Sequence, residues 1–227
     1  MNTIRFLFLI VFPAFFFTGC GTYAPPPATE APLVFPLESL AVFGFLSSPL
    51  PTGEKDGTVR SSLTGSIFVR GSVPSEIPEQ LTARLYERLS MRLSLELISP
   101  DIARQAFSTV KDSSYDFDDK EIVRKTGESV PAAAVLAGRV FRWQERIGAD
   151  FSISRPASVA FELALINVAD GNVIWKGKFD KTQASLAEDL LDLNTFLKGK
   201  GRWMSVEDLA EIGLSELVER LPLAKKE

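Results

Sequence analysis

The spacing of apolar residues predicts where the folded part of the chain begins. Residues 40–45 are apolar without a break, which is typical of a strand that is buried on both of its faces. Residues 46–66 contain two prolines and three glycines and predict a long loop. Residues 67–69 then predict a short strand at the edge of a sheet.

A four-residue period follows this loop. Leu81, Leu85 and Leu89 lie four positions apart, with charged residues on the other face, so an amphipathic helix is expected from Pro78 onward. Proline suits the first turn of a helix, because its missing N–H would have no partner there. Residues 95–98 predict the next buried strand.

The middle of the chain predicts two short helices followed by three strands. Helices are expected at about 101–110 and 120–128, and a long strand is expected over 133–146. Residues 159–168 and 173–175 predict two more strands. These two are expected to pair, because Asp-Gly between two apolar runs is a strong signal for a tight hairpin.

The C-terminal region is predicted to be helical. Leucines at positions 186, 190 and 193 indicate one short helix. Ser205, followed by acidic residues, is typical of an N-cap, and the apolar stripe after it predicts a last helix that Pro222 ends. The order β-α-β-α-α-β-β-β-α predicts a single α/β domain, a three-layer or two-layer sandwich with a mixed sheet.

The N-terminus carries a different pattern. Arg5 precedes an apolar run at 6–17, and small residues stand before Cys20, the only cysteine of the chain. The run is shorter than the roughly 20 residues that span a bilayer. This pattern predicts a bacterial lipoprotein signal, cut between Gly19 and Cys20, with acyl chains on Cys20 as a stable anchor. An ordinary secretory signal or an uncleaved anchor is the alternative.

These features divide the chain into four parts. We expect a lipoprotein signal peptide at 1–19, a lipidated Pro-rich tether at 20–37, an α/β domain at 38–222 and a charged tail at 223–227. An extended tether of this length reaches roughly 55 Å at most. Gly21, where an Asp would favour retention in the inner membrane, favours the periplasmic face of the outer membrane.

Composition and net charge argue against several classes of function. Loss of residues 1–19 removes one basic residue and leaves 24 basic and 29 acidic residues, a net charge of −5. Such a chain offers no basic surface for nucleic acid. It has no histidine, the commonest general base and metal ligand, and no Gly-x-Ser-x-Gly motif. We therefore expect no enzyme, no cofactor and no small-molecule substrate; a Ser–Lys pair is the remaining catalytic alternative.

A few groups of residues could still carry a function. The acidic stretch 112–119 lacks the register of a calcium loop, and capping of the next helix is the simpler interpretation, so no metal site is expected. Glu145 and Glu162 are expected on strand surfaces. Large aromatic and cationic side chains could anchor a partner, although packing is the alternative for the tryptophans. The candidate partner-binding residues are Trp143, Arg202 and Trp203.

Several short runs resemble a known group of proteins. LAGRV at 136–140, PASV at 156–159 and GNVIW at 171–175 resemble a group of uncharacterised bacterial envelope lipoproteins. More distantly, the strand at 41–45 and the helix at 81–89 resemble the superfamily that holds the curli secretion lipoprotein and the lipoprotein activators of penicillin-binding proteins. The resemblance spans most of the α/β domain and implies an α/β fold with a role in the cell envelope.

These observations favour a binding or scaffolding protein of envelope assembly or secretion. Its partners would be an envelope protein and the outer-membrane lipid that holds the acylated Cys20. An activator of a peptidoglycan synthase is the alternative, although a reach of roughly 55 Å is short for that crossing; a cryptic hydrolase is the third. A pore former is not expected, because residues 46–74 lack two alternating strand segments.

Overall fold

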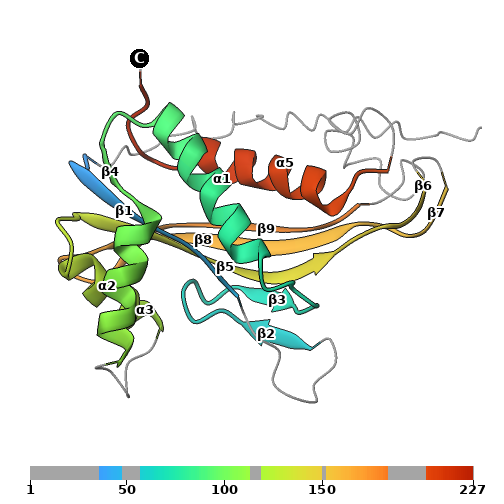
Figure 1. Cartoon of the computed structure of the whole chain (residues 1–227), viewed down its shortest axis with the longest axis horizontal. Coiled ribbons are helices and arrows are strands. Elements are labelled where there is room, and N and C mark those ends of the chain that lie inside the picture. Colours follow the sequence, from blue (N-terminus) through green and yellow to red (C-terminus); the bar gives the residue numbers. More distant parts are fainter. Residues whose placement is uncertain (1–35, 48–56, 113–118, 150–151, 184–202, 227) are drawn as a thin grey trace, which may run out of the picture. The chain divides into compact units, whose positions relative to one another are not determined.

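The computed structural model describes residues 36–47, 57–112, 119–149, 152–183 and 203–226. A five-stranded sheet has the strand order β4-β1-β5-β8-β9, in which β1 is parallel to β4 and β5 and the remaining pairs are antiparallel (Figure 1). Its strands are β1 (Ser39–Ser47), β4 (Glu96–Ile98), β5 (Ala134–Gln144), β8 (Ser158–Asn167) and β9 (Val173–Thr182).

Helices cover both faces of this sheet. Helices α1 (Ile77–Arg92) and α5 (Val206–Glu219) pack on one face, and helices α2 (Pro100–Asp112) and α3 (Asp119–Glu128) pack on the opposite face (Figure 1). The predicted α/β sandwich with a mixed sheet is therefore confirmed, in its three-layer form. The predicted helix at 186–193 lies outside the described residues, and no described helix has both the length and the apolar character needed to cross a bilayer.

The loop predicted at 46–66 is wrong in its second half. Strand β2 (Thr58–Arg60) pairs antiparallel with β3 (Ile67–Val69), and together they form a separate hairpin rather than an edge of the main sheet. The long strand predicted to reach residue 146 ends at Gln144. A second small hairpin follows it, made of β6 (Ile147–Ala149) and β7 (Ser152–Arg155).

Strand β1 is apolar without a break because both of its faces are buried. Leu40 and Val42 face helices α1 and α5, whereas Ala41 and Phe43 face helices α2 and α3. A bulge between Val42 and Gly44, where Gly44 has a φ of +80°, then reverses the alternation so that Phe45 faces helix α1.

A hydroxyl group of helix α1 satisfies a backbone amide at this bulge. The Phe45 amide donates a hydrogen bond of 2.8 Å to Oγ1 of Thr82 on helix α1, and that hydroxyl donates to the carbonyl oxygen of Pro78 at 2.7 Å. Two other predictions about local structure are confirmed. Ser205 caps helix α5 by accepting the amide of Asp208 at 3.1 Å, and β8 and β9 form the predicted hairpin.

Candidate functional site

The two faces of the sheet are covered differently. Helices α1 and α5 extend over one face, whereas the other is shared between the helix pair α2–α3 and the β2–β3 hairpin (Figure 1). Phe68 is the inward side chain of β3, and it stacks on Phe141 of β5 with ring centroids 4.0 Å apart. A boundary, which we call the seam, therefore crosses this face of the sheet between the helix pair α2–α3 and the β2–β3 hairpin.

A buried carboxylate lies at this seam. Glu162 is fully buried in the middle of β8, directly opposite Arg139 of β5. The expectation that Glu162 is a strand-surface residue is wrong, because both faces of β8 are covered. Its two oxygens accept hydrogen bonds from the hydroxyls of Ser61 and Thr64, which belong to the turn between β2 and β3.

The seam joins three parts of the fold. Asp119, the first residue of helix α3, accepts hydrogen bonds from Arg139, at 2.8 Å, and from the hydroxyl of Ser62. Leu63, between the hydroxyl-bearing residues of the turn, is buried among the residues under helices α2 and α3. These contacts fasten the β2–β3 turn to the sheet and to the start of helix α3.

Burial shifts the pKa of this carboxyl group. Loss of hydration raises the pKa of Glu162, while hydrogen bonds from Ser61 and Thr64 and the charges of Arg139 and Lys178 act in the opposite direction. The Ser61 hydroxyl also accepts the amide of Leu63 at 3.0 Å and is only 4% exposed. A hydroxyl in this position fixes the turn and is closed to a substrate, so the Ser61–Glu162 pair is structural.

A stability measurement against pH tests this assignment. Because the pKa of Glu162 is raised in the folded state, its contribution is fully present below the usual Glu value of about 4.3 and is lost as pH rises through the folded-state pKa. We expect the free energy of unfolding of the natural protein to fall relative to that of Glu162→Gln as pH rises from about 4 toward neutrality. Two parallel curves would contradict a Glu162 carboxyl group whose pKa is raised by burial.

The other end of the hairpin is held by basic side chains. Arg142 of β5 donates to Oγ of Ser158 at 2.7 Å, to the carbonyl oxygen of Val69 at 2.8 Å and to Asp180 at 2.6 Å. Lys178 of β9 donates to the carbonyl oxygen of Ile67 at 2.6 Å. Two strands of three residues each would not be stable alone, so these contacts explain why the hairpin is ordered.

The outer face of the hairpin is exposed. We define it by Thr58, Arg60, Ile67 and Val69, which alternate with the inward residues Val59 and Phe68. Ile67 and Val69 are each 51% exposed and lie two positions apart on one strand. The hairpin is therefore fixed from behind and presents two adjacent apolar side chains outward.

Of the predicted partner-binding residues, the two that the structure describes, Trp143 and Trp203, do not lie on this surface. Cys20, Gly19 and Arg202 lie outside the described residues. Trp143 is only 8% exposed and packs in the core under helices α1 and α5, which agrees with the packing alternative. Trp203 is half-buried, and its carbonyl oxygen accepts a hydrogen bond of 3.0 Å from Arg146 near the start of helix α5.

A bulge explains the burial of Trp143. The pairing of β5 with β8 shifts between Val140 and Arg142, which reverses the side-chain alternation for the rest of the strand. Arg142 therefore points toward the hairpin, and Trp143 points toward the helices. Glu145, just after the strand, is exposed as expected, and its carboxylate accepts the amide of Val206 at 3.3 Å.

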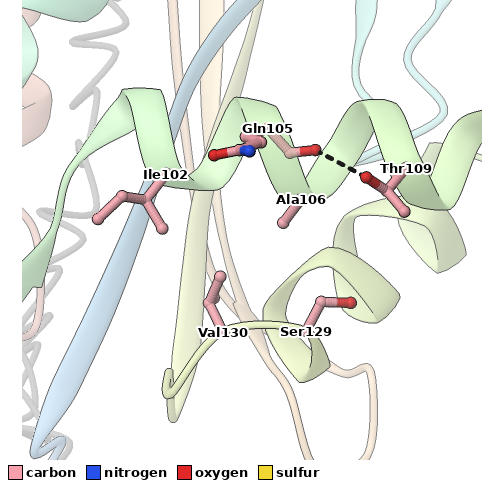
Figure 2. Close-up of a pocket in the computed structure, with 6 residues that line it drawn as sticks. All are labelled: Ile102, Gln105, Ala106, Thr109, Ser129 and Val130. Atoms are coloured by element: carbon pink, nitrogen blue, oxygen red, sulfur yellow. Dashed lines mark hydrogen bonds between the residues drawn. The ribbon is translucent and has the colours of Figure 1, made fainter.

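An open groove lies between helix α2 and the turn after helix α3. It has a volume of about 340 Å³, and Figure 2 shows Ala106 and Val130 pointing into the space between the two elements. None of its lining residues is charged; they are Ile102, Gln105, Ala106, Thr109, Ser129 and Val130. As for metals, residues 113–118 of the acidic stretch are not described, and the described residues contain no cluster of His, Cys, Asp or Glu suited to an ion.

Comparison with known proteins gives structural likenesses only. No family model matches the chain, and no curated protein matches it. The C-terminal domain of LpoB from Salmonella enterica is similar with 16% identity and a TM-score of 0.37, over 64% of this chain and 83% of that one. Lipoprotein GNA1162 from Neisseria meningitidis is similar with 13% identity and a TM-score of 0.40, over 70% and 91%.

A third likeness is to the PelC dodecamer from Paraburkholderia phytofirmans. It has 13% identity and a TM-score of 0.44, over 82% of this chain and 89% of that chain. Since every one of these TM-scores lies below 0.5, we base no functional conclusion on them.

Proposed function

We propose that this protein is a lipid-anchored component of the bacterial envelope that acts by binding another envelope protein. Cys20 would carry the acyl chains, and the domain would work at the periplasmic face of the outer membrane. The observation that supports this proposal most directly is the structure of the β2–β3 hairpin. Its inner face is fixed to the sheet, and Ile67 and Val69 are exposed on its outer face.

The way the hairpin is held supports this proposal. Ordering two three-residue strands costs conformational entropy, and the seam at Glu162 together with Arg142 and Lys178 offsets that cost. A partner that meets a rigid surface loses less entropy on binding than one that must order a loop. Exposed apolar side chains on a rigid element are therefore well suited to a protein interface.

The polar groups of the site support binding over catalysis. The buried Ser61 hydroxyl and the Glu162 carboxylate hydrogen-bond each other, so neither presents a free reactive atom to solvent. Arg142 makes three hydrogen bonds, one to the hairpin at Val69 and two to the sheet at Ser158 and Asp180. An active site needs reactive groups that are free to meet a substrate, and the reactive groups of these side chains are engaged in structural hydrogen bonds. We propose accordingly that the protein is not an enzyme.

Site-specific crosslinking tests the proposed surface. A photo-reactive amino acid at Val69 should give an adduct of one defined mass in intact cells, and the same group at Met91 should not. Met91 is a matched control, because it is 65% exposed and apolar but lies on helix α1. The adduct should be found in the membrane fraction, and Cys20→Ala should move the protein to the soluble periplasmic fraction.

The crosslinked partner also decides between finer functions. A peptidoglycan synthase in the Val69 adduct would favour the activator, and another envelope protein would favour scaffolding. Equal labelling from Val69 and Met91 would contradict the assignment of the hairpin as the binding surface. Retention of the Cys20→Ala variant in the membrane would contradict the lipid anchor, and it would do so independently of the surface.

A further inference from the structure

A second concave site lies where the hairpin ends. This pocket has a volume of about 400 Å³ and is formed by the residues that follow β3 and by the nearby sheet face of β5, β8 and β9. Its size is within the range of small-ligand pockets. The residues that the argument uses are Arg70, Arg142, Gln144, Asp180 and Thr182.

Arg70 differs from the other arginine of this pocket. Arg142 is held by three hydrogen bonds, whereas Arg70 forms no side-chain hydrogen bond and no ion pair with any described residue. The Nε atom of Arg70 is nevertheless buried and has no partner. Arg70 therefore brings to the pocket a positive charge that no described carboxylate pairs with.

The charge around the pocket favours an anion. Asp180 is the acidic residue of the lining, and both of its oxygens are already engaged, one by Arg142 at 2.6 Å and the other by Lys178 at 3.3 Å. Arg70 adds a further positive charge, so the positive charges of Arg70, Arg142 and Lys178 outnumber the negative charge of Asp180. Asp180 is thus paired with Arg142 and Lys178 and not with Arg70, and it does not make the pocket acidic.

Neutral donors complete the lining. The Gln144 side-chain amide has no hydrogen-bond partner among the described residues. The hydroxyl of Thr182 shares a 2.6 Å hydrogen bond with that of Ser158, in which either oxygen can be the donor. An arginine fork with an amide and a hydroxyl nearby is a donor set that matches an oxyanion.

We propose that this pocket binds the oxyanion of a carboxylate or phosphate group, with Arg70 as its main ligand. The bound group accepts hydrogen bonds from the terminal Nη atoms of the Arg70 guanidinium, and Gln144 donates a further one. A carboxylate at the end of a peptide and a phosphate group share this chemistry. The proposal does not depend on partner binding at Ile67 and Val69.

Calorimetric titration of the mature lipidated protein in non-ionic detergent tests this site. The probes are inorganic phosphate, acetyl-Ala-Ala with a free carboxylate, and acetyl-Ala-Ala amide, all at constant ionic strength. We expect saturable binding of phosphate or of the free carboxylate, a higher melting temperature when it is bound, and no effect of the amide. Binding of phosphate alone identifies a phosphate ligand, and binding of the acid peptide identifies a chain end.

Two variants show whether Arg70 is responsible. Arg70→Gln should weaken the binding by about tenfold or more, because it removes a charge-assisted hydrogen bond. Arg60→Gln is the matched control and should stay within about twofold, since Arg60 lies on the same hairpin but outside the pocket and donates to the carbonyl oxygen of Gly65. If Arg70→Gln folds poorly, Gln144→Leu should still weaken the binding. Equal affinities of all three variants and the natural protein, or no saturable binding by it, would overturn the proposal.

Discussion

Replacing Phe68 with Ala should release the β2–β3 hairpin from the sheet. The Phe68 side chain is 1% exposed, stacks on Phe141 and lies under the Nζ atom of Lys178, 4.4 Å from the ring centroid. Truncation of a buried Phe typically costs about 3–5 kcal/mol, because apolar contacts are lost and a cavity remains. The free energy of opening the hairpin should fall by an amount in this range.

Native-state hydrogen exchange measures this opening directly. The ladder amides of β2 and β3 should exchange about 100-fold faster or more in Phe68→Ala, since 1.4 kcal/mol corresponds to a factor of ten. Ile67→Ala and Val69→Ala are matched controls on the same strand. Both side chains are half-exposed, so each substitution should change the opening free energy by less than about 1 kcal/mol. Equal effects at 67, 68 and 69 would show that the hairpin is not anchored through Phe68.

Sequence patterns predict the elements that local chemistry specifies. The two-sided burial of β1 follows from its unbroken apolar run, and the N-cap of helix α5 follows from Ser205 and the acidic residues after it. The hairpin of β8 and β9 follows from Asp170 and Gly171, of which Gly171 has a φ of +70°. In each case a few neighbouring residues decide the structure.

The features that the sequence analysis missed depend on distant partners or on single insertions. Ser61 and Glu162 are 101 positions apart, so no local period connects them. One bulge in β5 exchanges the faces of Arg142 and Trp143, and no pattern of apolar residues marks where that bulge falls. Strand β2 has three residues and its inward apolar side chain is Val59, which is too short a signal for a period of two.

One signal for the seam was present in the sequence. Glu162 interrupts an otherwise apolar run over 159–166, and a strand that is apolar at both odd and even positions has no solvent-facing side. A carboxylate in such a strand must be buried with donors around it. This reasoning finds Glu162 but not Ser61 and Thr64, whose turn meets the strand only in the folded chain.

The double substitution Ser61→Ala with Thr64→Val should destabilise the whole domain. It leaves the Glu162 carboxylate buried without its hydroxyl donors, and breaking a buried polar network from one side typically costs about 3–5 kcal/mol. Urea unfolding at pH 7 should show this loss. The loss should become smaller as pH falls, because the raised pKa of Glu162 favours protonation, which removes the buried charge.

Adding Glu162→Leu to this double variant should recover most of the lost stability. Replacement of a whole buried polar group by apolar side chains is often nearly neutral, whereas removal of one side of it is not. Glu162→Leu alone should be destabilising, because it leaves the hydroxyls of Ser61 and Thr64 buried without their acceptor. The two sides are therefore coupled, and the three measurements form a cycle that isolates their interaction. If the triple variant were no more stable than the double variant, the loss would come from the turn itself, and Glu162 would not be what holds the hairpin at the seam.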